Sequence, residues 1–202
     1  MNIAVGMKKS TKCIGKYEAP LINRICQHFD SLGFKTFPHV RFNIAWGSSL
    51  SDIDVIAMRN NVVTAVEIKS RKDKISRATS QLNAMLDYVD YTYLATDRPL
   101  RNWQHSKSGV LLVEQNEIRV VRRASKITNE PRLESLFALP KKCLLRLLGV
   151  TQDSKLLKYD IAERILAVFD DETLRQCMKE IVLCQDCNEN ECPIINLVSE
   201  FS

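Results

Sequence analysis

Two carboxylates and one lysine stand inside two apolar runs in the first half of the chain. They are Asp54, Glu67 and Lys69, and the pair Asn60-Asn61 between the two runs is a turn signal. Because side chains alternate along a strand, Glu67 and Lys69 lie on one face and apolar residues on the other. Buried charges are costly unless they are paired or bind a metal. The pattern therefore predicts a divalent cation held by Asp54 and Glu67, with Lys69 facing the bound substrate.

The spacing of Asp54 and Glu67-Ile68-Lys69 resembles the motif of the PD-(D/E)xK nuclease superfamily, which has the restriction-endonuclease-like fold. The stretch that follows is similar to small bacterial members with a basic turn, a helix carrying an inward Gln and a strand after an Asp. Gln81 and Asp90 occupy those two positions, whereas Met85 stands where some relatives have a Tyr. The resemblance covers residues 17–124 well and the C-terminal third loosely.

The resemblance implies a site that hydrolyses phosphodiester bonds with Mg²⁺ or Mn²⁺ as cofactor. Asp54 and Glu67 would bind the metal, and the carbonyl of Ile68 would add a further oxygen ligand, as hard cations prefer. Lys69 would orient the attacking water or stabilise the transition state. Gln81 would bond an active-site carboxylate, the water or the nucleic-acid backbone; the alternative is an exposed polar residue of the helix.

Two further acids have two interpretations each. Glu18 opens the first predicted helix, over residues 18–32 with Gly33 as its cap. In many superfamily members an acid from this helix joins the metal site; otherwise Glu18 is a first-turn acid favoured by the helix dipole. Asp52 shares a face with Asp54 and is an alternative ligand. The apolar context favours Asp54 as the ligand and places Asp52 at the start of the strand.

The elements that position these residues follow from periodicity and punctuation. Alternation from Val40 to Trp46 predicts a strand, which would complete an antiparallel meander with the two charged strands. A helix is predicted over residues 76–88, followed by a strand over residues 91–95. A right-handed crossover would place that strand parallel to the Glu67 strand. A hairpin is predicted over residues 109–121.

Composition bounds the class of protein. The chain has 202 residues, of which 45% are hydrophobic and 26% charged, as in ordinary globular proteins that bury their own core. No apolar run approaches the ~20 residues of a spanning helix, and the N-terminal lysines follow the apolar residues, unlike a signal peptide. We therefore expect a cytoplasmic protein without a membrane partner. The seven cysteines are then expected as thiols or metal ligands rather than disulfides.

The net charge of +5 is unevenly distributed. After Phe169 eight acids stand against two bases, which gives −6 and leaves +11 for the rest of the chain. A basic body suits a polyanionic partner. The same cations could instead be a solvated helix start or edge charges that block aggregation, and Trp103 and His105 between them could contact bases or cover core. The candidate contacts to a nucleic-acid backbone are Arg71, Lys72, Lys74, Arg119, Arg122 and Arg123.

The last third of the chain has a different pattern of apolar residues. From Pro131 onward, leucine-rich segments at helical spacing predict a small bundle of short helices. Four cysteines near its end have spacings that suit a Zn²⁺ site. If Cys13 replaces the first of them, the set resembles the iron–sulfur ligands of some nucleases of the superfamily. Against both, the first two fall at helical positions and a second C-x2-C pair is missing. The four are Cys177, Cys184, Cys187 and Cys192.

The sequence therefore predicts an α/β (α+β) fold, with a restriction-endonuclease-like mixed sheet flanked by helices and a helical C-terminal appendage. The expected domains are a nuclease-like domain over residues 1–128 and a helical region over residues 129–202. The predicted function is metal-dependent hydrolysis of nucleic acid, in the first place DNA, with a homodimer left open as the assembly. The alternative is a non-catalytic nucleic-acid-binding or assembly module on the same fold, with a structural zinc or iron–sulfur site.

Overall fold

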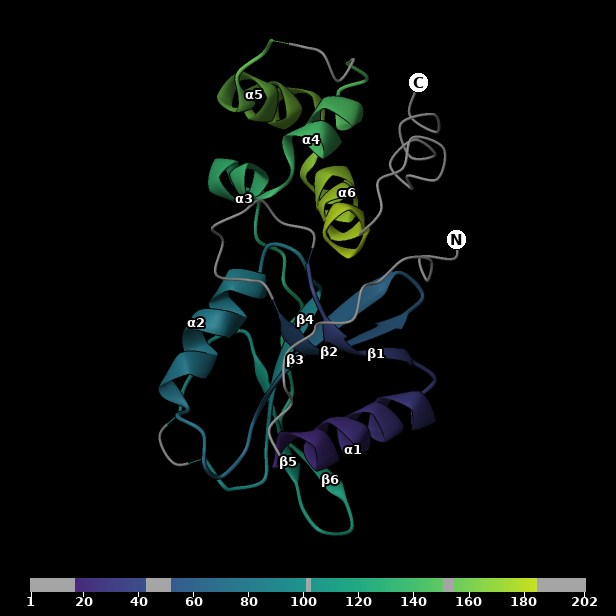
Figure 1. The fold of residues 1–202 in the computed structure, drawn as a ribbon, viewed down its shortest axis with the longest axis vertical. Coiled ribbons are helices and arrows are strands. Elements are labelled where there is room, and N and C mark those ends of the chain that lie inside the picture. Colours follow the sequence, from purple (N-terminus) through teal and green to yellow (C-terminus); the bar gives the residue numbers. More distant parts are fainter. Residues whose placement is uncertain (1–16, 43–51, 101–102, 151–154, 185–202) are drawn as a thin grey trace. The chain divides into compact units, whose positions relative to one another are not determined.

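The structure is a computed structural model that describes residues 17–42, 52–100, 103–150 and 155–184 (Figure 1). The chain divides into two compact units. Residues 17–40 and the described residues between 52 and 128 belong to the first unit, which contains a β-sheet. The described residues from 129 onward belong to the second unit, which contains helices.

The first unit is built on a mixed sheet that, among the described residues, has six strands in sequence order. The first three strands form an antiparallel meander, the third to fifth strands run parallel, and the sixth returns antiparallel. The predicted fold class, a mixed sheet flanked by helices, is confirmed. The strands are β1 (Lys35–Val40), β2 (Ile53–Arg59), β3 (Val62–Lys69), β4 (Tyr91–Thr96), β5 (Gly109–Val113) and β6 (Ile118–Arg122).

A two-residue turn joins β2 to β3. Asn60 (φ 49°) and Asn61 (φ 63°) both adopt the left-handed conformation, which Asn tolerates better than most residues. The turn fixes the register, in which Val55 pairs with Val66. A slip of one residue would turn Glu67 to the opposite face of the sheet, so this register decides which charged side chains meet.

The edge strand β1 lies earlier in the chain than predicted. Alternation predicted a strand from Val40 to Trp46, but β1 ends at Val40 and residues 41–42 are not in a strand. Residues 43–46 lie outside the described residues. Pro38 concealed the true strand, because proline is excluded from central strands. An edge strand tolerates proline, and β1 is the edge strand beside β2.

Helix α1 (Glu18–Ser31) covers one face of the sheet (Figure 1). It ends at Ser31, and Gly33 follows Leu32 as the predicted cap residue, with a φ of +79° that suits glycine. Burial of each large apolar side chain stabilises the packing by about 1.5–3 kcal/mol. The predicted apolar side of α1, namely Leu21, Ile22, Ile25 and Phe29, packs on Val55, Ala57, Val66, Ile68, Ala95, Leu111 and Val113.

Helix α2 (Ser76–Met85) lies on the other side of the sheet, against β3 and β4 (Figure 1). It connects these two parallel strands, as predicted. Its apolar side is buried at Leu82. Because α1 packs on Val66 and Ile68, alternation along β3 places Glu67 on the face beneath α2.

Asp90 joins the start of β4 to β3. Its Oδ2 accepts a hydrogen bond from the N–H of Val63 at 2.7 Å, and its own N–H donates to the Val63 carbonyl at 2.8 Å. The carbonyl of Asp90 accepts from the N–H of Ile127 at 2.9 Å. These bonds fix the parallel register, in which Thr64 pairs with Tyr91.

The second unit consists of short helices with leucine-rich buried sides, as predicted. Helix α5 packs against α3 and α4, with Leu136, Leu144 and Ile165 fully buried. Asp170 caps α6 by accepting the N–H of Thr173 at 3.0 Å. Within the described ranges, no helix is both long enough and apolar enough to cross a membrane. The helices are α3 (Leu133–Ala138), α4 (Lys141–Leu147), α5 (Lys158–Val168) and α6 (Asp171–Leu183).

The role of Asp90 can be tested by removing its side chain. Asp90→Ala should lower the free energy of unfolding by about 1–3 kcal/mol, because the N–H of Val63 loses a buried acceptor. Asp90→Asn keeps an acceptor oxygen and should lose less, which makes it the matched control. Urea titration followed by fluorescence measures both variants. Equal unfolding midpoints for wild type and Asp90→Ala would contradict the role assigned to Asp90.

Candidate active site

Asp54 and Glu67 stand opposite each other on β2 and β3. Val55 pairs with Val66, and the next step along the two strands sets Asp54 opposite Glu67. Directly opposed residues of an antiparallel pair share a face, with Cβ atoms about 4.5–5.5 Å apart. Both residues are buried, with exposed fractions of 3% and 1%. The two acids that the sequence assigns to one cation are therefore neighbours on one face.

Lys69 lies two residues beyond Glu67, at the end of β3 and on the same face. Its Nζ forms an ion pair with Oε1 of Glu67, and its side chain is only 13% exposed. On the other strand, Oδ2 of Asp54 accepts a hydrogen bond from the N–H of Ile68 at 2.8 Å. Nothing in the sequence indicated this hydrogen bond between Ile68 and Asp54. The two contacts hold both carboxylates at the seam between β2 and β3.

These donors fit a hard divalent cation. Asp54 and Glu67 offer carboxylate oxygens, and Ile68 brings a backbone carbonyl to the same strand end. Mg²⁺ keeps several waters and commonly uses one or two carboxylates. Across the described residues, no three or more His, Cys, Asp or Glu side chains gather in a group that could bind a metal. Among the described residues, the oxygen donors at this strand end are thus the carboxylates of Asp54 and Glu67 and the carbonyl of Ile68.

Glu18 does not complete a three-acid group with Asp54 and Glu67 among the described residues. It lies in the first turn of α1, which packs on the face opposite to Glu67. The start of α1 does approach the turn after β3, because Nζ of Lys72 lies 3.9 Å from the centre of the Tyr17 ring. This position agrees with the interpretation of Glu18 as a first-turn acid.

Gln81 lies on the sheet-facing side of α2, between the buried residues Ala78 and Leu82. Its Oε1 is buried and has no hydrogen-bond partner among the described residues. A buried acceptor without a donor costs about 1–3 kcal/mol. Gln81 is thus turned inward, as the resemblance implies, on the same side of the sheet as Glu67.

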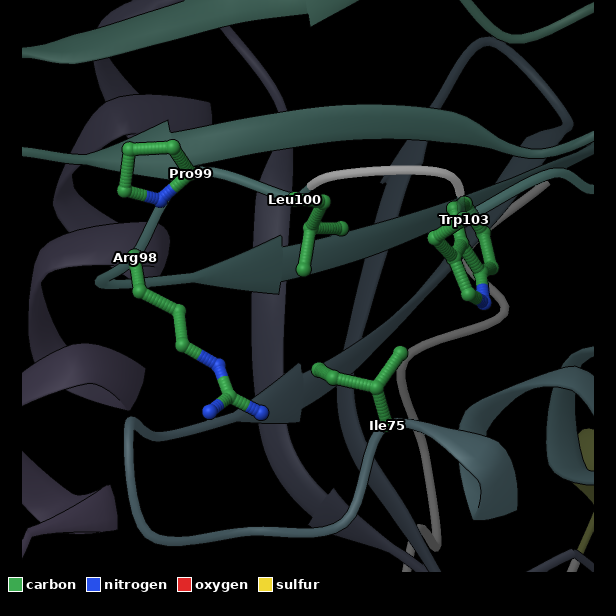
Figure 2. A pocket seen from close by; sticks show the side chains of 5 residues that line it. All are labelled: Ile75, Arg98, Pro99, Leu100 and Trp103. Carbon is green, nitrogen blue, oxygen red and sulfur yellow. The ribbon is translucent and has the colours of Figure 1, made fainter.

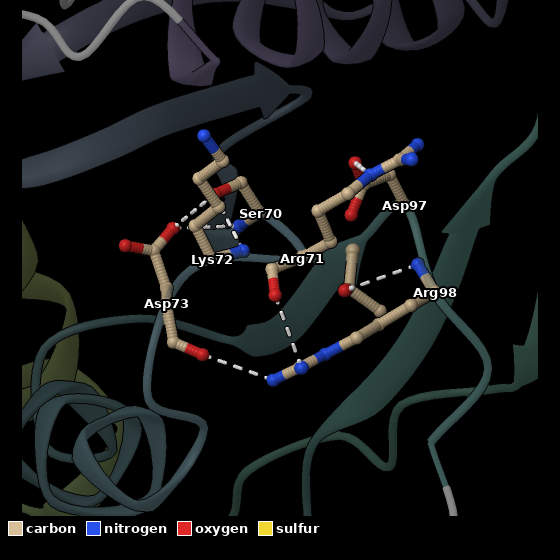
Figure 3. A network of polar contacts seen from close by, with 7 residues as sticks. Ser70, Arg71, Lys72, Asp73, Asp97 and Arg98 are labelled. Carbon is tan, nitrogen blue, oxygen red and sulfur yellow. Dashed lines mark hydrogen bonds and ion pairs between the residues drawn. The ribbon is translucent and has the colours of Figure 1, made fainter.

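The turn after β3 is tied down by Asp73 and by Arg98, which follows β4 (Figure 3). Oδ2 of Asp73 accepts hydrogen bonds from the N–H of Ser70 at 2.8 Å and from its hydroxyl at 2.7 Å. Arg98 donates to the carbonyls of Arg71 at 3.2 Å and Asp73 at 2.9 Å. Sequence analysis missed both residues. Asp73 had a local turn signal, whereas the Arg98 contacts span more than twenty residues and had none.

The cations of this turn are presented to solvent. Lys72 and Lys74 are exposed. Arg71 is 70% exposed and its Nε contacts Oδ2 of Asp97 at 3.1 Å (Figure 3). An exposed ion pair of this kind contributes about 0–1 kcal/mol, so Arg71 can exchange it for a phosphate at little cost. All three cations lie within five residues after Lys69.

The second group of candidate cations divides by exposure. Arg122 is turned inward: its Nε donates to the carbonyl of Ser108 at 3.0 Å, and its guanidinium lies 5.1 Å from the centre of the Trp103 ring. Arg119 is 57% exposed and pairs with Glu114 at 3.5 Å. Arg123 is exposed. Arg119 and Arg123 are therefore the cations of this group that face solvent.

Trp103 and His105 are anchored to α2 by contacts that the sequence did not predict. Nε1 of Trp103 donates to Oγ1 of Thr79 at 3.3 Å, and its ring stacks on His105 with centres 5.9 Å apart. Nε2 of His105 bonds Oδ1 of Asn83 at 2.8 Å, while Nδ1 accepts the N–H of Ser108 at 3.2 Å. Because Nδ1 is an acceptor, His105 is neutral, with its proton on Nε2.

The described cysteines of the C-terminal cluster are buried. Cys177 lies within α6 and Cys184 at its end. Burial raises the pKa of Cys177 to about 12, and the charge of Glu180 adds to the effect. Zinc and iron–sulfur clusters bind cysteine as the thiolate, and a metal site on these cysteines stays a prediction. Cys13, Cys187 and Cys192 lie outside the described residues.

Comparison with known proteins finds a distant structural neighbour. No protein-family model matches the chain, and no curated protein matches it. Among solved structures, SPO1766, a protein of unknown function from Silicibacter pomeroyi, is similar at 18% identity and a TM-score of 0.45. The match covers 61% of this chain and 78% of that protein. A likeness this distant carries no argument about function.

The neutral state of His105 predicts a pH dependence. Burial lowers the pKa of His105, and the positive charge of Arg122 adds to the shift. The unfolded chain then binds a proton near pH 6.5 while the folded chain does not, so stability falls as the pH drops through this value towards the lower folded pKa. Above about pH 6.5 the contribution is fully present.

The measurement compares urea unfolding of wild type and His105→Gln between pH 5 and pH 8. The difference in unfolding free energy between the two proteins should shrink as the pH falls. His28→Gln is a second comparison: burial alone lowers the pKa of His28, so its difference from wild type should also shrink as the pH falls. Parallel curves for wild type and His105→Gln would contradict the neutral, hydrogen-bonded assignment of His105.

Proposed function

We propose that this protein is a divalent-metal-dependent nuclease that hydrolyses phosphodiester bonds of nucleic acid, in the first place DNA. The proposal rests on the pairing of Val55 with Val66, which, extended by one residue, sets Asp54 opposite Glu67 on one face, and on the ion pair of Lys69 with Glu67. Two acids repel each other when buried side by side. Lys69 offsets one negative charge, and a divalent cation between the carboxylates is the complement that this arrangement favours.

The scaffold supports the same proposal. The described elements run helix, three-strand meander, helix and parallel strand, which is the succession that the resemblance to PD-(D/E)xK nucleases implies. Asp54, Glu67 and Lys69 gather at one end of the β2–β3 pair, where β3 leads into the exposed cations of the following turn. Such cations neutralise phosphates and hold a strand beside the acids.

Each residue has a distinct task in the proposed reaction. Asp54 and Glu67 would hold the cation, with the carbonyl of Ile68 as a further oxygen ligand; the cation would supply Lewis-acid chemistry at the phosphate and a lowered pKa of water. Lys69 is held beside the carboxylates and stabilises the negative charge that grows on the phosphate in the transition state. Oε1 of Gln81 is an acceptor, so its partner must be a donor. Water is such a donor at Oε1, while the amide nitrogen of Gln81 can donate to an active-site carboxylate or to a phosphate.

Removal of the lysine is the first test of this function. Lys69→Ala should fold normally and lose about 10²–10³-fold in cleavage rate, the usual cost of removing one group that stabilises transition-state charge. Asp54→Asn should abolish cleavage. The assay incubates plasmid, linear duplex, single-stranded DNA and RNA with Mg²⁺ or Mn²⁺.

Lys35→Ala is the matched control, because Lys35 is exposed and begins β1 opposite Met58, at the far end of β2 from Asp54. It should cleave at the wild-type rate. Wild-type activity in clean preparations of both Lys69→Ala and Asp54→Asn would remove the assignment.

Metal binding is the second test and separates an enzyme from a binding module. Calorimetric titration with Mn²⁺ should give a site in wild type that is lost in Glu67→Gln and kept in Glu114→Gln, a change of an acid in the β5–β6 hairpin. Loss of the carboxylate removes an oxygen ligand and half of the charge on which a hard cation depends.

A wild-type protein that binds no Mn²⁺ would contradict the metal site. Binding of Mn²⁺ without cleavage of any substrate would instead identify a non-catalytic nucleic-acid-binding module on the same fold.

A further inference from the structure

A pocket of about 420 Å³ opens where the connections after β3 and β4 meet (Figure 2). Its size falls in the range of sites that hold small planar ligands. Its lining is mostly apolar, with one cation. The lining residues are Ile75, Arg98, Pro99, Leu100 and Trp103.

Two planar groups line this pocket, and both are held in place from behind. The indole of Trp103 is fixed by its bond to Thr79 and by its stack on His105. The guanidinium of Arg98 is fixed by its bonds to the carbonyls of Arg71 and Asp73. Both groups therefore keep their orientation without a ligand, which lowers the entropy cost of binding.

Both connections that form the pocket begin at strand ends beside the candidate active site. Lys69 pairs with Thr96, and these residues end β3 and β4. The chain reaches Ile75 within one turn after Lys69, and Arg98 two residues after Thr96. The Trp103 bond to α2 places this residue on the side of the sheet that also carries Glu67. The pocket and Lys69 therefore lie at the same end of β3 and β4.

The geometry points to a binding pocket for one unpaired nucleobase of the nucleic acid whose backbone lies at Asp54, Glu67 and Lys69. This assignment rests on the proposed nuclease function and deepens it. Proteins that bind single strands stack bases on aromatic rings and on arginine planes, while cations follow the backbone. Trp103 and Arg98 supply the two planar groups, and the exposed cations after β3 supply the charge.

The pocket also restricts the substrate. A base inside a duplex is covered by its neighbours, so it reaches such a pocket only when it is flipped out, frayed or in a single-stranded region. The substrate class is therefore nucleic acid with an unpaired nucleotide next to the scissile bond. The lining of the pocket is mostly apolar and has no described carboxylate or amide side chain. Because Arg98 already donates to the carbonyls of Arg71 and Asp73, we expect binding that is tolerant of base identity.

The test removes the base rather than the pocket. Glu67→Gln protein, which should bind substrate without cleaving it, is titrated against a fluorescent duplex with a single-stranded overhang, and binding is read by anisotropy. A set of overhangs carries one abasic site at each successive position. Loss of the base at one or two adjacent positions should weaken binding about 5- to 150-fold, the range seen for loss of one base–aromatic stack.

Protein variants then locate the base. In Trp103→Leu, the abasic site should cause no further loss of affinity for the overhang substrate. Trp103→Phe keeps an aromatic ring but loses the bond to Thr79, and the abasic site should still weaken binding to this variant. Tyr159→Leu, a matched aromatic change at an exposed position of α5, should behave as the parent protein. Near-UV circular dichroism checks that each variant folds. The abasic scan on the Glu67→Gln protein tests the pocket even if a Trp103 variant fails to fold.

The outcomes separate this pocket from the proposed function. Flat binding across the abasic scan, with normal cleavage of the same overhang by wild type, would overturn the pocket and leave the nuclease intact. A folded Trp103→Leu that keeps the full abasic penalty would also overturn it. A mononucleotide that competes as tightly as the strand would assign the pocket to free nucleotides instead. Absence of both binding and cleavage would overturn the pocket together with the nuclease.

Discussion

The register of the β2–β3 hairpin is the constraint on which the rest of the site depends. It sets Asp54 opposite Glu67 and leaves Lys69 at the open end of β3, within a sheet whose other positions are mostly aliphatic. Removing ionised groups from water costs several kcal/mol for each ion unless opposite charges and hydrogen bonds replace the water. The Lys69 ion pair and the bond from Ile68 to Asp54 provide such replacement. Aliphatic residues at these positions would avoid this cost.

The connections after β3 and β4 extend this site instead of merely closing the sheet. The parallel pairing of β3 and β4 brings the two connections to the same edge, and Arg98 ties them together. One connection carries the exposed cations, and the other leads to Trp103. A charged site, a turn with exposed cations and a mostly apolar pocket are therefore brought to one end of two neighbouring strands. This arrangement suits a single strand of nucleic acid that passes from one to the next.

The sequence predicted the elements whose signals are local. The Asn60-Asn61 turn, the apolar side of α1 and the crossover through α2 all depend on residues close together in the chain, and the structure contains each of them. Once the turn was recognised, period-2 alternation was enough to put Glu67 and Lys69 on one face. The inward position of Gln81 likewise follows from its helical spacing to Leu82 and its neighbours.

Features that depend on tertiary neighbours could not be predicted in this way. Whether Pro38 ends a strand depends on its place at the sheet edge, which only the topology reveals. Charge alone did not distinguish Arg122, which packs on Trp103, from the exposed Arg123. The contacts of Arg98 join segments more than twenty residues apart. The pocket was missed for the same reason, because its walls come from separate connections.

The most direct measurement of the central claim is an anomalous diffraction map from crystals of the full chain soaked in Mn²⁺. The account predicts a peak within ligand distance of the carboxylates of Asp54 and Glu67 and of the carbonyl of Ile68, with Lys69 beside it. The same crystals of Glu67→Gln should lack the peak. A map in which Mn²⁺ avoids this seam, or in which the two carboxylates point to opposite faces of the sheet, would contradict the account.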